Sequence, residues 1–115
     1  MEDQEAISAL GALAQEDRLS AFRLLMAEGP AGLPSGTVAA RLDIQPTRMS
    51  FHLTTLERAG LLTARRDGRH IHYAVDYQRM RSLLGFLMED CCGGNPAVCS
   101  LSTGTISTAQ KPGCV

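Results

Sequence analysis

Two runs of apolar side chains at helical spacing occupy the start of the chain. Residues 6–14 repeat alanine, isoleucine and leucine every three or four positions, and residues 19–26 repeat this pattern after a short polar break. Asp17 is a suitable N-cap for the second run, and Gly29 and Pro30 should end it because neither residue continues a helix well. The pattern predicts two consecutive helices.

Two more helices are predicted in the middle of the chain. A short helix should follow Ser35, and a longer helix should begin at Pro46, because proline suits the first helical turn. In the longer helix Met49, Leu53 and Leu56 share one face that should pack into the core. The opposite side should present Thr47, Phe51, Thr54 and Arg58, with Arg48 and Thr55 on its flank.

The pattern then changes from helical spacing to that of a β-hairpin. Residues 61–75 place β-branched and aromatic side chains on both sides of Asp67-Gly68, a strong hairpin turn signal. The final amphipathic segment, residues 76–90, returns to helical spacing. We therefore expect two strands joined by a tight, arginine-rich turn, followed by a last helix.

The order α-α-α-α-β-β-α is typical of a winged helix-turn-helix, a mostly α (α+β) fold. A chain of 115 residues with 44% hydrophobic and 20% charged residues fits one globular domain. We expect residues 1–92 to form this domain. Residues 93–115 are rich in Gly, Pro, Ser and Thr and should form a flexible tail that contains cysteines.

Charge is distributed unevenly along the chain, although the net formal charge is only -1. Residues 1–40 hold two arginines and six acidic side chains, whereas residues 41–81 hold eight arginines and four acidic side chains. A local cluster of arginines is what contact with the phosphates of nucleic acid requires, although it also suits a solvated surface. Double-stranded DNA is therefore the first partner to consider.

The outward side of the helix that begins at Pro46 and the arginines of the hairpin are the candidate DNA contacts. The helix side chains should approach bases or nearby phosphates, and Phe51 can touch a thymine methyl group. The hairpin side chains should contact phosphate or the minor groove and position the protein. His52 also has a simpler interpretation, which is packing or hydrogen bonding inside the protein. The complete set is Gln45, Thr47, Arg48, Ser50, Phe51, His52, Arg65, Arg66 and Arg69.

Three short motifs carry a resemblance to a known family. The motifs are S-F-H-L, L-E-R-A-G-L-L and R-R-D-G-R, and the resemblance extends over about residues 5–90. They resemble the recognition helix and wing of the ArsR/SmtB family of metal-responsive repressors. The resemblance implies a homodimer, paired through its first and last helices, that occupies operator DNA until an inducer binds. A two-fold dimer also reads two half-sites, which gives more specificity than one helix can.

Three thiols follow the last predicted helix, in the stretch EDCCGGNPAVCS. Cys91 and Cys92 are neighbours, so a disulfide between them would be strained. Gly and Pro residues after them allow the chain to turn back and bring Cys99 alongside. Three thiolates suit As(III) or Sb(III), whereas zinc usually takes a fourth ligand, for which Cys114 or a histidine would be needed.

The family resemblance both supports and complicates this metalloid interpretation. Many arsenic-responsive members carry C-V-C in the helix before the recognition helix, and here that helix reads SGTVAARLD. Other members carry vicinal cysteines and a third cysteine after the final helix, as Cys91, Cys92 and Cys99 do. We expect a repressor that responds to As(III) or Sb(III) and has no organic cofactor.

Other interpretations of the same residues remain open. They are a redox-sensing or a zinc- or cadmium-responsive repressor of the same fold, a winged helix that binds protein, and unselected cysteines in the tail. A thiol enzyme is disfavoured because Cys91 and Cys92 follow acidic residues at a helix C-terminus, which opposes thiolate formation. The chain shows neither a secretion signal nor an apolar run long enough to span a bilayer, so we expect a cytoplasmic protein with no membrane partner.

Overall fold

The computed structural model describes residues 1–89. Cys91, Cys92 and Cys99, and the tail expected over residues 93–115, lie outside the described residues. The chain divides into a first unit, Met1–Met80, and a second unit that begins at Arg81 within the last helix.

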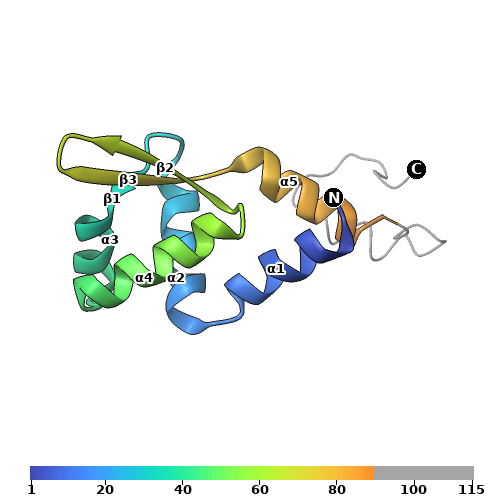
Figure 1. Cartoon of the computed structure of the whole chain (residues 1–115), viewed down its shortest axis with the longest axis horizontal. Helices are drawn as coiled ribbons and strands as arrows, with labels where there is room; N and C mark the ends of the chain where they lie inside the picture. Colours follow the sequence, from blue (N-terminus) through green and yellow to red (C-terminus); the bar gives the residue numbers. More distant parts are fainter. Residues whose placement is uncertain (90–115) are drawn as a thin grey trace. The chain divides into compact units, whose positions relative to one another are not determined.

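The described residues form five helices and three strands (Figure 1). They are, in chain order, α1 Asp3–Leu13, α2 Glu16–Glu28, β1 Leu33–Pro34, α3 Ser35–Leu42, α4 Pro46–Arg58, β2 Leu62–Asp67, β3 His70–Val75 and α5 Tyr77–Leu87. This architecture confirms the predicted mostly α (α+β) class and adds one strand, β1, that the sequence pattern did not predict.

α1 packs its small side chains inward and leaves its large ones exposed. Alanines at positions 6, 9 and 12 are buried against α2 and α4, whereas Ile7 is 60% exposed and Leu10 is 41% exposed. Small side chains allow the helices to approach closely. Among the described residues, the bulky apolar side chains of α1 are therefore exposed.

The start of α2 differs from the prediction. Gln15, and not Asp17, is the N-cap, because its side chain accepts a hydrogen bond from the backbone N–H of Arg18 at 2.9 Å. The helix thus begins at Glu16, and Asp17 lies within its first turn. This leaves the carboxylate of Asp17 available for contacts with another helix. The end of α2 is at Gly29, as predicted.

α3 and α4 form the helix-turn-helix. Pro46 is the first residue of α4, and Met49, Leu53 and Leu56 are fully buried, which confirms the predicted inward face. α4 contacts α2 and α3 on this side and β2 near its end. The core therefore fixes the rotation of α4 about its axis and so decides which side chains point outward.

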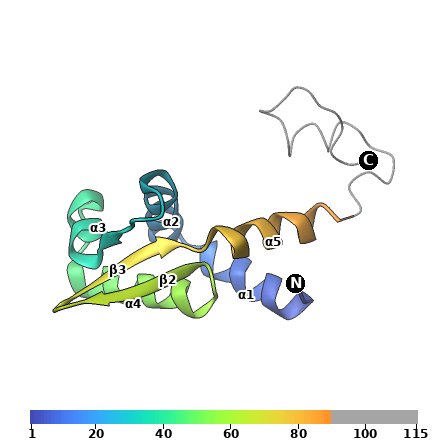
Figure 2. The ribbon, with the colours of Figure 1, turned by 90° about the horizontal axis from the view of Figure 1, so that it is seen from above.

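The sheet has the strand order β1-β3-β2 and is antiparallel throughout. Leu33 of β1 pairs with Tyr73, and Leu62 of β2 pairs with Val75. α2 packs on β3 and α4 on β2, so the base of the hairpin is attached to the helices (Figure 2). Tyr73 and Val75 are buried, whereas every residue of β2 after Leu62 is exposed.

α5 begins directly after β3. The carboxylate of Asp76 accepts a hydrogen bond from the backbone N–H of Arg79 at 3.0 Å, and the hydroxyl of Tyr77 donates to the carbonyl of Met26 at 3.1 Å. Further along α5, Leu84 and Leu87 are exposed. Among residues 1–89, no helix is both long and apolar enough to cross a membrane.

Candidate nucleic-acid interface

The outward side of α4 carries most of the predicted contact residues. Thr47, Ser50 and Phe51 are exposed, and Phe51 is 64% exposed. Gln45 is also exposed and comes directly before the helix. An apolar ring this exposed on a helix whose opposite face is fully buried gains nothing from the core, so it is available to a partner.

Arg48 lies on the flank of α4 and is paired within the protein. Its Nη2 atom donates to Oδ2 of Asp17 at 3.2 Å, while its side chain remains 57% exposed. Asp17 belongs to the first turn of α2 and is 31 residues away in the sequence. Local sequence patterns do not indicate this pair. The prediction that Asp17 is an N-cap assigned its carboxylate to the backbone of α2 instead.

His52 is not part of the exposed side. It is only 7% exposed, with Nδ1 3.4 Å from Nη1 of Arg18 and Nε2 3.5 Å from Oδ2 of Asp17. Its position, one residue beyond Phe51 on the helix, turns the ring toward α2. This position agrees with the packing interpretation of His52, whose role as a DNA contact stays a prediction.

The hairpin presents the second group of predicted contacts. Arg65 and Arg66 lie in β2 and are exposed, and Arg69 lies in the turn. The turn is formed by Gly68 and Arg69, one residue later than predicted, because Asp67 still pairs with His70. Gly68 has a φ of 65°, as the first position of a type II′ hairpin turn requires.

The strand register decides which hairpin side chains share a face. Arg65 is opposite His72, and Arg66 is opposite Ile71, so these two arginines point to different faces of the hairpin. His70 and His72 share the face of Arg65. Within residues 1–89, none of the three hairpin arginines forms an ion pair with a carboxylate.

The exposed side of α4 and the hairpin belong to the same unit. Both views place the β2–β3 turn and the beginning of α4 toward the same end of that unit (Figure 1, Figure 2). Exposed guanidinium groups and a helix with outward polar and aromatic side chains are the combination that contacts phosphates and groove edges.

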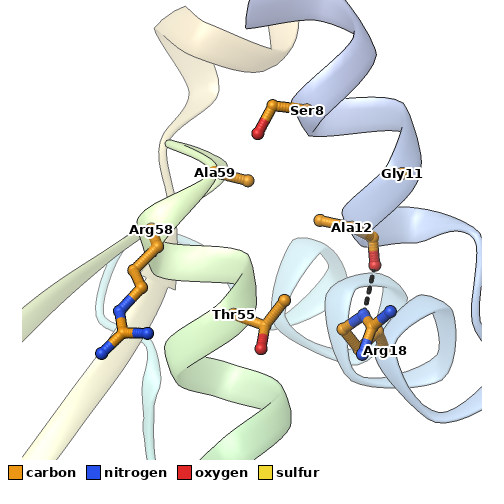
Figure 3. A pocket seen from close by; sticks show the side chains of 7 residues that line it. All are labelled: Ser8, Gly11, Ala12, Arg18, Thr55, Arg58 and Ala59. Carbon is orange, nitrogen blue, oxygen red and sulfur yellow. Dashed lines mark hydrogen bonds between the residues drawn. The ribbon is translucent and has the colours of Figure 1, made fainter.

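An open pocket of about 310 Å³ lies between α1, α2 and the end of α4 (Figure 3). Arg18 and Arg58 are the charged residues in its lining. Nε of Arg18 donates to the carbonyl of Ala12 at 2.6 Å, so this guanidinium is already committed to a contact between the two helices. The remaining lining residues are Ser8, Gly11, Ala12, Thr55 and Ala59.

Metal ligation is a separate question from DNA contact. Within residues 1–89, no group of three or more His, Cys, Asp or Glu side chains is arranged to hold a metal ion. The predicted thiolate ligands Cys91, Cys92 and Cys99 lie outside this part of the chain.

Comparison with known proteins agrees with this architecture. A helix-turn-helix domain model matches residues 13–65, from the end of α1 into β2. The HTH-type transcriptional regulator YceK of Bacillus subtilis is 33% identical over 87 residues, which cover 75% of this chain and 86% of YceK. The transcriptional activator HlyU of Vibrio cholerae is 26% identical over 91 residues, which cover 79% of this chain and 82% of HlyU.

Solved structures show the same fold. The structure of V. cholerae HlyU superposes with a TM-score of 0.61 over 80% of this chain and 99% of HlyU, at 26% identity. A protein described as a possible transcriptional regulator for arsenical resistance superposes with a TM-score of 0.63 over 88% of this chain and 98% of that protein, at 25% identity.

The winged helix-turn-helix with its exposed basic hairpin is an architecture of transcriptional regulators, and the named relatives are transcriptional regulators and not enzymes. The chain belongs to the HTH-type transcriptional regulators. This agrees with the class of regulator that the predicted ArsR/SmtB family implies, whereas the arsenic-responsive variant stays a prediction.

Proposed function

We propose that the protein is a repressor that binds operator DNA as a homodimer and is released when three cysteine thiolates bind As(III) or Sb(III). The observation that carries the DNA-binding part is the side of α4 that exposes Thr47, Ser50 and Phe51, in the same unit as the exposed arginines of the hairpin. Side chains of α4 read base edges in the major groove, and the hairpin arginines contact phosphates.

The apolar face of α1 supports the homodimer. Ile7 and Leu10 are large, exposed and one helical turn apart, and α5 independently exposes Leu84 and Leu87. Covering such side chains with a second copy removes apolar area from water. A two-fold dimer then presents two α4 helices to half-sites ~34–36 Å apart.

The inducer is assigned from the chemistry of the donor set. Cys91, Cys92 and Cys99 offer three soft sulfur ligands in nine residues, a number that suits a pyramidal As(III) or Sb(III) ion. The similarity to a protein described as a possible regulator for arsenical resistance supports the same assignment. The cysteines follow α5, whose exposed leucines we place in the dimer contact.

Release follows from linkage. The metalloid weakens DNA binding only if it binds the free dimer more tightly than the DNA-bound dimer, with a typical coupling of about 1–3 kcal/mol. A small change in the angle between the two subunits would move the two α4 helices out of register with successive grooves.

Fluorescence anisotropy tests the proposal. The full-length protein is bound to a duplex from its own upstream region and titrated separately with arsenite, zinc and peroxide. We expect arsenite to release the wild type and to leave Cys99→Ser bound, with Cys114→Ser as the matched control that is still released. Release by zinc alone, or by peroxide without metalloid, would instead establish the metal-responsive or redox-sensing alternative.

A further inference from the structure

The carboxylate of Asp17 contacts two side chains of α4 at once. Its Oδ2 atom lies 3.2 Å from Nη2 of Arg48 and 3.5 Å from Nε2 of His52. Arg48 and His52 are four residues apart, so they stand one above the other on the same side of the helix. One oxygen from the first turn of α2 therefore restrains the beginning of the helix that we assign to base recognition.

The other ring nitrogen of His52 contacts Arg18, and this contact determines which ring nitrogen carries the proton. A guanidinium group can only donate hydrogen bonds, so Nδ1 of His52 accepts from Nη1 of Arg18. The ring proton then belongs on Nε2, the atom that faces Asp17. Arg18 is anchored in turn by the carbonyl of Ala12. The carboxylate of Asp17 thus meets a buried donor in a fixed position.

Arg48 keeps most of its binding capacity despite this contact. Its guanidinium has five N–H donors, and the contact with Asp17 engages Nη2 only. The side chain is 57% exposed, whereas that of Asp17 is only 23% exposed. An arginine with a fixed guanidinium plane loses less conformational freedom when it donates two hydrogen bonds to O6 and N7 of a guanine.

We propose that Asp17 is a specificity-determining positioning residue, which orients Arg48 for a bidentate contact with a guanine in the operator. This inference rests on the proposed DNA-binding function. It adds that Arg48 recognises one base pair of the operator. Asp17 touches no DNA itself and acts only through Arg48, and His52 keeps the carboxylate in place.

A different role for Asp17 predicts that its removal changes the affinity for DNA in the opposite direction. If Asp17 only masked the charge of Arg48, its removal would increase attraction to every DNA duplex, because one negative charge near the phosphates would be lost. Positioning, in contrast, affects the selected sequence alone. The ratio of the two affinities therefore distinguishes the roles.

The experiment compares dissociation constants on two duplexes of about 30 base pairs, enough for two half-sites. One is enriched by the wild-type protein from a random pool, and the other is a shuffled duplex of the same composition. For Asp17→Asn we expect the ratio of selected to shuffled affinity to fall about tenfold. Glu16→Gln is the matched control, because it removes the same charge from the neighbouring exposed position and should preserve the ratio.

Two further variants distinguish an effect that acts through Arg48 from general damage to the fold. Arg48→Lys keeps the charge but replaces the planar guanidinium fork by a flexible ammonium, so it should lower the ratio of selected to shuffled affinity to the same extent as Asp17→Asn. In an Arg48→Ala background, Asp17→Asn should lower the ratio no further. Equal tightening of both duplexes by Asp17→Asn would overturn the inference, as would a further loss in the Arg48→Ala background. A wild type that does not distinguish the two duplexes would overturn the proposed function instead.

Discussion

Gly32 occupies a position where the fold admits no side chain. Its φ is +70°, and an added Cβ would overlap the carbonyl oxygen of Tyr73 in the neighbouring strand. Both the backbone conformation and the space therefore require glycine. This contact places β1 against β3 at the beginning of the helix-turn-helix.

Gly32→Ala should lower the free energy of unfolding by more than about 3 kcal/mol, since it adds a backbone clash to an unfavourable φ. Gly29→Ala is the control, because Gly29 also has a positive φ of +96° but open space around its Cβ direction. We expect it to cost less, about 1–3 kcal/mol, because only its backbone conformation is strained. Urea unfolding followed by circular dichroism measures both, and equal costs would contradict the clash.

The sequence predicted single residues well where one helix determines their environment. Met49, Leu53 and Leu56 are buried as expected, because periodicity along one helix is visible in the sequence. The sequence did not predict the partners of Asp17, since its contacts with Arg48 and His52 depend on how α2 and α4 pack. His52 shows the same limit. It follows the exposed Phe51 by one residue, and that single step around α4 places its ring against α2 and not in solvent.

The beginning of α1 is stabilised by a capping box that depends on pH. The backbone N–H of Glu2 donates to Oε1 of Glu5 at 2.9 Å, and Arg79 donates to Oε2 at 3.3 Å. The hydrogen bond from Glu2 and then the Arg79 guanidinium hold the pKa of the Glu5 carboxyl below its ordinary value of 4.5. Since the folded state lowers this pKa, the stabilisation is present above 4.5 and is lost as pH falls through the folded pKa.

Arg79→Ala should raise the pKa of Glu5 toward its ordinary value, while the hydrogen bond from Glu2 keeps part of the effect. NMR titration of the Glu5 carboxyl carbon measures this change. Arg81→Ala removes the same charge two residues further along α5 and should leave the pKa of Glu5 where it is in the wild type. An unchanged pKa in Arg79→Ala would show that this ion pair contributes nothing to the capping box.

The hairpin should act as an electrostatic element, and salt dependence tests this directly. Replacing Arg65 and Arg66 with alanine should flatten the slope of log affinity against log salt by about 1 for each arginine that neutralises a phosphate. Arg23→Ala, an exposed arginine of α2, should leave the slope unchanged. A slope that stays constant in the hairpin variant would favour a protein partner for the winged helix.

At the scale of elements, five helices and the hairpin were predictable, whereas β1 was not. Long elements repeat their pattern several times, so their type is clear even where a boundary moves by one residue, as at the hairpin turn. β1 has only two residues, Leu33 and Pro34, and exists because β3 offers hydrogen-bonding groups to it. Such a strand has no periodicity of its own.

For the whole molecule, the dimer should contribute to stability. Because Ile7 and Leu10 are exposed in one chain, we expect the thermal unfolding midpoint to rise with protein concentration. Leu10→Lys should give a monomer in sedimentation experiments and remove this dependence. Ser20→Lys places the same charge on the exposed side of α2 and should remain dimeric. A monomeric wild type would contradict the assigned role of α1.

The short strand β1 also affects how the protein behaves when crowded with other copies of itself. β1 and β2 are the two outer strands of the sheet, and an outer strand is where sheets of different molecules can join into aggregates. Pro34 has no N–H to offer on one outer strand, and Arg65 and Arg66 place charge on the other. The same arginines that we assign to phosphate contact thus also keep an exposed hairpin from fusing with its neighbours.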